Sequence, residues 1–112
     1  IRTSVFVDPT EEMVQGAALT GTDRIELYTE AYARHYSADR DAAVAPFVRA
    51  AQAAAQAGLG LNAGHDLDLN NLRFLKQHLP NLLEVSIGHA LVCDALYFGL
   101  ENTIQMYLRE LS

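Results

Sequence analysis

Hydrophobic and polar residues alternate along four short segments of the chain, and helical patterns separate these segments. The alternating segments are residues 3–7, 24–28, 59–63 and 83–87. Strands that alternate with helices are typical of βαβ units around a parallel sheet. The pattern predicts four βα units, and no low-complexity linker or block of charge divides residues 1–112 into separate domains.

Helices are predicted between and after the strands, at residues 11–19, 41–57, 69–78 and 90–111. Pro9 and Thr10 suit the beginning of the first helix, and Asp41 suits the N-cap of the second. Gly99 predicts a break in the last one. The segment 29–40, rich in tyrosine, alanine and charged residues, is expected to be a connection.

Apolar residues in the last helix recur at helical spacing. Ile104, Tyr107, Leu108 and Leu111 fall at i, i+3, i+4 and i+7, which predicts one buried stripe. Cys93 also has apolar neighbours at helical spacing, and we expect it to be a buried packing residue rather than a nucleophile.

One side of each predicted strand is aliphatic and the other carries polar residues. The polar positions are Ser4, Glu26, Asn62 and Ser86. An open doubly wound sheet, covered by helices on both faces, would carry aliphatic residues on both. A parallel sheet with one polar face is instead typical of the TIM (β/α)8 barrel. The polar residues then face the barrel interior, where catalytic groups lie near the carboxyl ends of the strands.

We therefore expect an α/β fold in which this chain supplies about four βα units, a half barrel, plus C-terminal helices. A complete barrel typically needs about 250 residues, and the two outer strands of a half barrel would present unpaired edges. The expected partner is the N-terminal half of the same barrel, or a second copy of the chain.

The composition of the chain argues against several classes of function. Eight Lys and Arg residues against 14 Asp and Glu residues give a formal charge of −6, which argues against nonspecific nucleic-acid binding. No apolar stretch reaches the roughly 18 residues of a membrane span. One cysteine and the absence of zinc-type Cys/His spacing favour a reducing, cytoplasmic location and no metal site.

The densest cluster of candidate chemistry is Asn62-Ala63-Gly64-His65-Asp66, where a predicted strand ends. Histidine is the side chain best suited to proton transfer near neutral pH, and Gly64 permits close contact or a positive φ. The alternative is a plain βα turn in which Asp66 caps the next helix.

A second strand-Gly-His-helix segment, Ser86-Ile87-Gly88-His89-Ala90, follows one unit later. In (β/α)8 barrels the loops after the last two strands often bind phosphate through backbone N–H groups at a helix N-terminus. Gly88 would allow close approach, and His89 would add a donor. The alternative is a glycine at a helix start with an incidental histidine.

Glu26 lies in mid-strand between Ile25 and Leu27, where a carboxylate is rarely buried without a partner or a purpose. Facing the barrel interior, it could stabilise a cationic intermediate or transfer a proton. A structural ion pair with an Arg or Lys of another strand is the alternative.

Four segments together resemble the pyridoxine 5′-phosphate synthase family: residues 4–8 (SVFVD), 24–29 (RIELYT), 61–67 (LNAGHDL) and 86–90 (SIGHA). The resemblance covers essentially the whole chain and corresponds to strands five through eight of the family's barrel. It implies a homo-oligomeric transferase without an organic cofactor. The implied reaction, in de novo vitamin B6 biosynthesis, condenses 3-amino-2-oxopropyl phosphate with 1-deoxy-D-xylulose 5-phosphate and yields pyridoxine 5′-phosphate, phosphate and water.

The resemblance also implies roles for individual residues. His65 looks like the proton donor and Glu26 like the group that stabilises the transition state. Asp66, at a position where many members carry glycine, is expected to bind the amino-oxopropyl phosphate together with Gly88 and His89.

The family's remaining catalytic histidine and glutamate lie in an N-terminal half that this chain lacks, so the 112 residues alone are expected to be inactive. Two other functions stay open at this point. One is a stand-alone phosphate-binding half-barrel module, and the other is a different phosphate-substrate barrel enzyme, because fold alone does not determine the reaction.

Overall fold

A computed structural model describes residues 1–112 as an α/β structure with four strands and six helices. The elements are β1 (Ser4–Val7), α1 (Glu11–Leu19), β2 (Arg24–Tyr28), α2 (Glu30–His35), α3 (Arg40–Gln56), β3 (Gly60–Gly64), α4 (Leu72–His78), β4 (Leu82–Ser86), α5 (His89–Phe98) and α6 (Leu100–Leu111). All four predicted strands are present, and their bounds differ from the prediction by at most one residue.

The four strands form one parallel sheet in the order β1-β2-β3-β4. Ser4 is paired with Arg24, and Arg24 in turn with Gly60, while the register shifts once between β3 and β4. A doubly wound sheet contains a point where the strand order reverses, and this sheet has none. The arrangement matches half of a (β/α)8 barrel.

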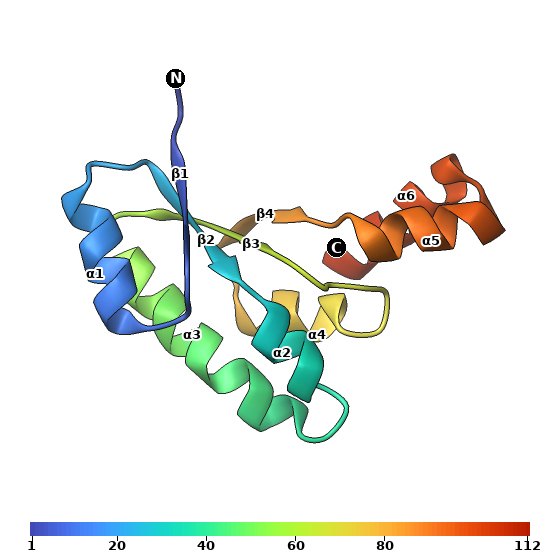
Figure 1. Cartoon of the computed structure of the whole chain (residues 1–112), viewed down its shortest axis with the longest axis horizontal. Helices are drawn as coiled ribbons and strands as arrows, with labels where there is room; N and C mark the ends of the chain where they lie inside the picture. Colours follow the sequence, from blue (N-terminus) through green and yellow to red (C-terminus); the bar gives the residue numbers. More distant parts are fainter.

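The core lies between the aliphatic face of the sheet and the helices. Ile25 and Leu27 of β2 and Leu61 and Ala63 of β3 are fully buried. In Figure 1, α2, α3 and α4 lie along the same side of the strands, with α1 at one end of the molecule and α5 and α6 at the other. Phe6, on the opposite parity of β1, is 51% exposed, so the polar face of the sheet is open.

The helix N-termini show where local capping was predicted correctly and where it was not. Thr10 caps α1 as predicted, its Oγ1 accepting a hydrogen bond from the backbone N–H of Met13 at 3.2 Å. The prediction of Asp41 as the cap of α3 was wrong. Asp39 is the cap, because its extended backbone lets its side chain accept from Ala42 N at 3.1 Å, and Asp41 lies in the first turn.

The segment predicted to be a connection contains the helix α2. Tyr32 on this helix is fully buried, packs against Tyr36 and Phe47, and donates its hydroxyl to the Asn71 carbonyl. Burial of the Tyr32 side chain thus stabilises α2, which is too short to be recognised from its pattern of apolar residues. The helix predicted from residue 69 begins only at Leu72, since residues 68–71 form a turn.

The C-terminal region has the predicted break at Gly99, which has a φ of 83° and separates α5 from α6. The single buried stripe is only partly present: Tyr107 is buried, whereas Ile104 and Leu108 are exposed. Cys93 is exposed too, and no residue of α5 is buried, so its predicted packing role was wrong.

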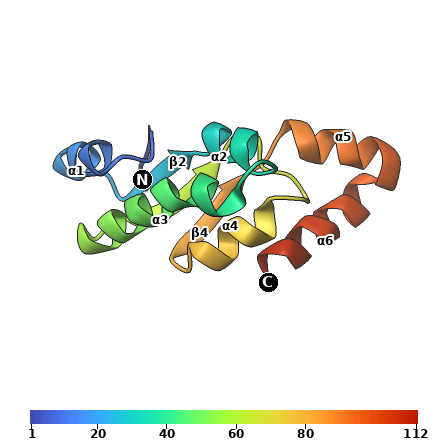
Figure 2. The same ribbon diagram turned by 90° about the horizontal axis from the view of Figure 1, so that it is seen from below.

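These errors share a cause, because α5 lies beyond the edge of the sheet (Figure 2) and packs mainly against α6, which leaves none of its residues buried. None of the helices combines the length and apolar character that a membrane crossing requires.

Candidate active site

One hollow at the carboxyl ends of the strands encloses about 440 Å³. Its walls come from the ends of β1 to β4, the loop after β3 and the start of α5. The lining residues are Phe6, Glu26, Gly64, His65, Asp66, Ser86, Ile87, Gly88 and His89. All five candidate residues from the sequence line this hollow. The parallel sheet thus brings together residues that lie at the ends of different strands and are far apart in the sequence.

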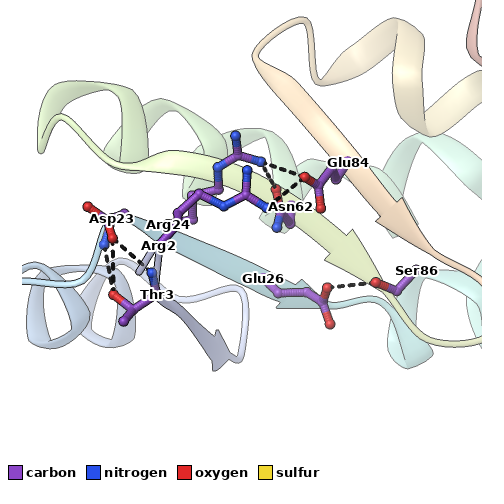
Figure 3. Close-up of polar contacts among 8 residues, drawn as sticks. All are labelled: Arg2, Thr3, Asp23, Arg24, Glu26, Asn62, Glu84 and Ser86. Carbon is purple, nitrogen blue, oxygen red and sulfur yellow. Dashed lines mark hydrogen bonds and ion pairs between the residues drawn. The ribbon is translucent and has the colours of Figure 1, made fainter.

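Glu26 reaches the hollow from β2. Its Oε1 accepts a hydrogen bond from the Ser86 hydroxyl of β4 at 3.0 Å, across the intervening strand β3 (Figure 3). No ion pair of the chain includes Glu26. Within residues 1–112 the carboxylate therefore has no cationic partner, and the structural ion pair considered for this residue is not formed by the four strands of this chain.

The cations of the polar face belong to a separate cluster nearer the amino ends of the strands (Figure 3). Glu84 pairs with Arg24 at 3.0 Å and with Arg2 at 2.9 Å, and Arg24 also donates to the side-chain oxygen of buried Asn62 at 3.1 Å. This cluster provides partners for Arg2 and Arg24. Glu26 lies outside it, in a second polar layer nearer the carboxyl ends of the strands.

Close packing at the end of β3 favours glycine at position 64. A Cβ at this position would lie 3.2 Å from Glu26 Oε2 and 3.1 Å from Ser86 Cβ. An added methyl group would therefore push the Glu26 carboxylate or Ser86 away from the backbone of β3 by a few tenths of an ångström. The positive φ angles occur at the next two residues, with 103° at His65 and 60° at Asp66.

Thr29 holds the backbone of this loop, although no local sequence pattern marks it as a site residue. Its hydroxyl donates to the His65 carbonyl at 2.5 Å, and its backbone N–H donates to the Gly64 carbonyl at 3.0 Å. Thr29 is fully buried. A non-glycine residue at φ 103° is uncommon and persists where surrounding contacts fix it, and Thr29 supplies such contacts.

The His65 side chain is held on two sides. Its Nδ1 lies 3.0 Å from Asp66 Oδ2, and the edge of its ring contacts Tyr28, with 4.7 Å between ring centroids. Asp66 does not cap a helix, because Asp68 Oδ1 accepts from Asn70 N and Asn71 N in the turn before α4. The prediction that Asp66 caps the next helix is therefore wrong.

Gly88 and His89 form the start of α5. No side chain caps this helix, so the N–H groups of its first turn are open to an anion. A Cβ at Gly88 would meet nothing within 4 Å, and His89 is exposed beside the hollow.

The hollow therefore combines groups for proton exchange with an end of a helix suited to phosphate. The two other histidines, His35 and His78, are absent from it.

The whole chain, residues 1–112, matches the family described as pyridoxal phosphate biosynthesis protein PdxJ. It is similar to proteins named pyridoxine 5′-phosphate synthase from three bacteria. It is 64% identical to that of Cytophaga hutchinsonii and 60% identical to that of Flavobacterium johnsoniae, each over 99% of this chain and 47% of the relative. Against that of Parabacteroides distasonis the identity is 63%, over 96% of this chain and 45% of the relative.

The chain thus spans about half the length of the curated relatives that it matches. The matched family and the arrangement of the strands agree with the resemblance seen in the sequence. The chain belongs to the PdxJ family of pyridoxal phosphate biosynthesis proteins.

Proposed function

We propose that this chain is the C-terminal half of a pyridoxine 5′-phosphate synthase. The enzyme condenses 3-amino-2-oxopropyl phosphate with 1-deoxy-D-xylulose 5-phosphate in vitamin B6 biosynthesis. The observation that carries the proposal is the convergence of Glu26, His65, Asp66, Gly88 and His89 on one hollow. Membership of the PdxJ family supports this choice over other phosphate-substrate barrel enzymes.

The residues suit the chemistry of this condensation. Imine formation, dehydration and ring closure need repeated proton transfers, for which His65 is the donor. Cationic nitrogen intermediates are stabilised by a nearby carboxylate, and Glu26 has no cation of its own to neutralise it. The open N-terminus of α5, with Gly88 and His89, binds the phosphate of the amino-oxopropyl substrate.

The remaining strands of the barrel come from an N-terminal half of the same protein. β1 and β4 are the outer strands of the sheet, and each has one unpaired edge. The catalytic histidine and glutamate that the family resemblance places in that half would complete the site. The isolated 112 residues are therefore inactive, and the complete barrels assemble into a homo-oligomer.

The test compares product formation by four proteins: the full-length protein, its His65→Ala and His35→Ala variants, and the isolated chain. His35 is an exposed control outside the hollow. We expect the full-length protein and His35→Ala to form pyridoxine 5′-phosphate, and His65→Ala to be slower by about 10²- to 10⁴-fold.

The isolated chain is expected to form no product. Turnover by the isolated chain would overturn the requirement for a second half. A well-folded full-length protein that binds phosphate but forms no product would contradict the synthase assignment and favour a phosphate-binding module.

A further inference from the structure

The carboxylate of Asp66 is directed to the imidazole of His65. Asp66 Oδ2 and His65 Nδ1 are 3.0 Å apart, which is hydrogen-bonding distance. No backbone N–H donates to the Asp66 carboxylate, because the turn before α4 is capped by Asp68 and Asn71. The Asp66 side chain therefore has His65 as its hydrogen-bond partner.

The backbone explains how two consecutive side chains come together. In an extended strand, adjacent side chains point to opposite faces. The positive φ angles of His65 and Asp66 interrupt this alternation directly after β3. Thr29 fixes the His65 carbonyl and Asn71 donates to the Asp66 carbonyl at 3.3 Å, so both residues of the pair are held through their main chain.

The pairing has a chemical consequence for the ring. An ionised carboxylate can only accept hydrogen bonds, so the Nδ1 atom that contacts it must carry a proton. In the neutral ring Nε2 then has the lone pair, and in the protonated ring Nε2–H is the remaining donor. A carboxylate on Nδ1 thus selects which ring nitrogen is left for chemistry.

We propose that Asp66 is a positioning residue that fixes the proton of His65 on Nδ1 and makes Nε2 the atom that exchanges protons with the substrate. This inference rests on the proposed function, in which His65 is the proton donor. The proposal also explains why a carboxylate lies next to a phosphate site. The Asp66 carboxylate is hydrogen-bonded to the imidazole, and the backbone of Asp66 remains available to bind the substrate.

The test uses the full-length protein with Asp66→Gly and Asp66→Asn. Glycine and asparagine both tolerate the φ of 60° at this position, so neither variant strains the loop, and both remove the carboxylate. Asp41→Asn is the matched control, because Asp41 is exposed in the first turn of α3 and makes no side-chain ion pair.

The first readout is the tautomer of His65, from long-range proton–nitrogen correlation spectra of protein labelled with ¹⁵N at histidine. Loss of one signal set in His65→Asn assigns the resonances. We expect the Nδ1-protonated neutral ring in the unmutated protein and in Asp41→Asn. In Asp66→Gly the Nδ1-protonated form should no longer dominate, whereas Asp66→Asn should retain part of it, because the amide oxygen of asparagine can still accept from Nδ1–H. An unchanged tautomer in Asp66→Gly would overturn the proposal whether or not the enzyme is a synthase.

The second readout is steady-state turnover. Loss of a complete general acid costs about 10²- to 10⁴-fold, so loss of its orienting partner should lower kcat by less, about tenfold. KM for the amino-oxopropyl phosphate should stay within about twofold or fall, because the substituted residues keep the backbone N–H and remove a negative charge near the phosphate.

The two readouts separate the possible failures. A changed tautomer with unchanged kcat would overturn the assignment of Nε2 as the exchanging atom. A raised KM with unchanged kcat would show that the carboxylate binds substrate, which also contradicts the proposal. A full-length protein that forms no pyridoxine 5′-phosphate would contradict the proposed function, and the spectra would then decide the His65–Asp66 pairing alone.

Discussion

Substitution of Gly64 by alanine should disturb the hollow at its tightest point. The added Cβ would lie 3.1 Å from Ser86 Cβ, 3.2 Å from the Ser86 carbonyl oxygen and 3.2 Å from Glu26 Oε2. Ser86 is paired with Gly64 in the ladder between β3 and β4, so even a shift of its backbone by a few tenths of an ångström would strain that pairing. The Glu26 carboxylate is the more mobile neighbour and should move away from its hydrogen bond with Ser86.

The magnitude follows from the packing. Insertion of a methyl group into a well-packed site typically costs about 1–3 kcal/mol. We expect Gly64→Ala to lower the free energy of unfolding of the full-length protein by this amount and to lower kcat more than it raises KM. The assays are chemical denaturation followed by circular dichroism, and product formation at saturating substrate.

Gly16→Ala is the matched control. Gly16 lies in α1, and an added Cβ there meets nothing within 4 Å. This change should be neutral in activity and should stabilise the protein by roughly 0.5–1 kcal/mol, because alanine favours a helix interior over glycine. If Gly64→Ala behaved like Gly16→Ala in both assays, the close approach of Glu26 to β3 would be refuted.

Three further predictions concern residues that do not line the hollow. Thr29→Val should lower the free energy of unfolding by about 1–3 kcal/mol in thermal denaturation, because it leaves the His65 carbonyl without its hydroxyl donor. Thr29→Ser should restore most of this loss, and equal stability of the two variants would contradict the role of the hydroxyl. Arg24→Met should lower the free energy of unfolding by about 1–3 kcal/mol, because it removes the hydrogen-bond donor to buried Asn62. Its kcat should be unchanged, and a large fall in kcat would contradict the separation of the two polar layers. Burial and the nearby Tyr36 raise the pKa of Tyr32 above its ordinary value, so its contribution to stability is complete below about pH 10 and declines as the pH rises toward the folded-state pKa. Denaturation midpoints at pH 8 and pH 11 should therefore differ less in Tyr32→Phe than in the unmutated protein, and an equal difference would contradict this linkage.

The strands were predictable because the alternation of apolar and polar residues is a local pattern within each strand. Alternation fixes which residues face the helices, and Ile25 and Leu27 are indeed buried while Glu26 lies on the other face. The meeting of Gly64, His65, Gly88 and His89 followed from position alone, since the carboxyl ends of parallel strands lie at one edge of a sheet.

Features that depend on distant contacts were not predictable in the same way. Tyr32 makes α2 stable through contacts with Phe47 and Asn71, which lie far away in the sequence. The bond from Thr29 to His65 joins residues 36 positions apart, and no local pattern marks it. Cys93 fits an apolar helical pattern, yet its face of α5 is uncovered in this chain, so spacing alone gave the wrong environment.

In the proposed function, the Glu26 carboxylate and the groups around it carry out the condensation. The decisive measurement is the rate at which the full-length protein and its Glu26→Gln variant form pyridoxine 5′-phosphate from the two phosphorylated substrates. Glutamine keeps the size of the side chain and one oxygen that can accept from Ser86, and it replaces the charged carboxylate by a neutral amide. We expect a kcat about 10²- to 10³-fold lower in the variant, with its stability little changed. A variant as fast as the unmutated protein would contradict this role of Glu26.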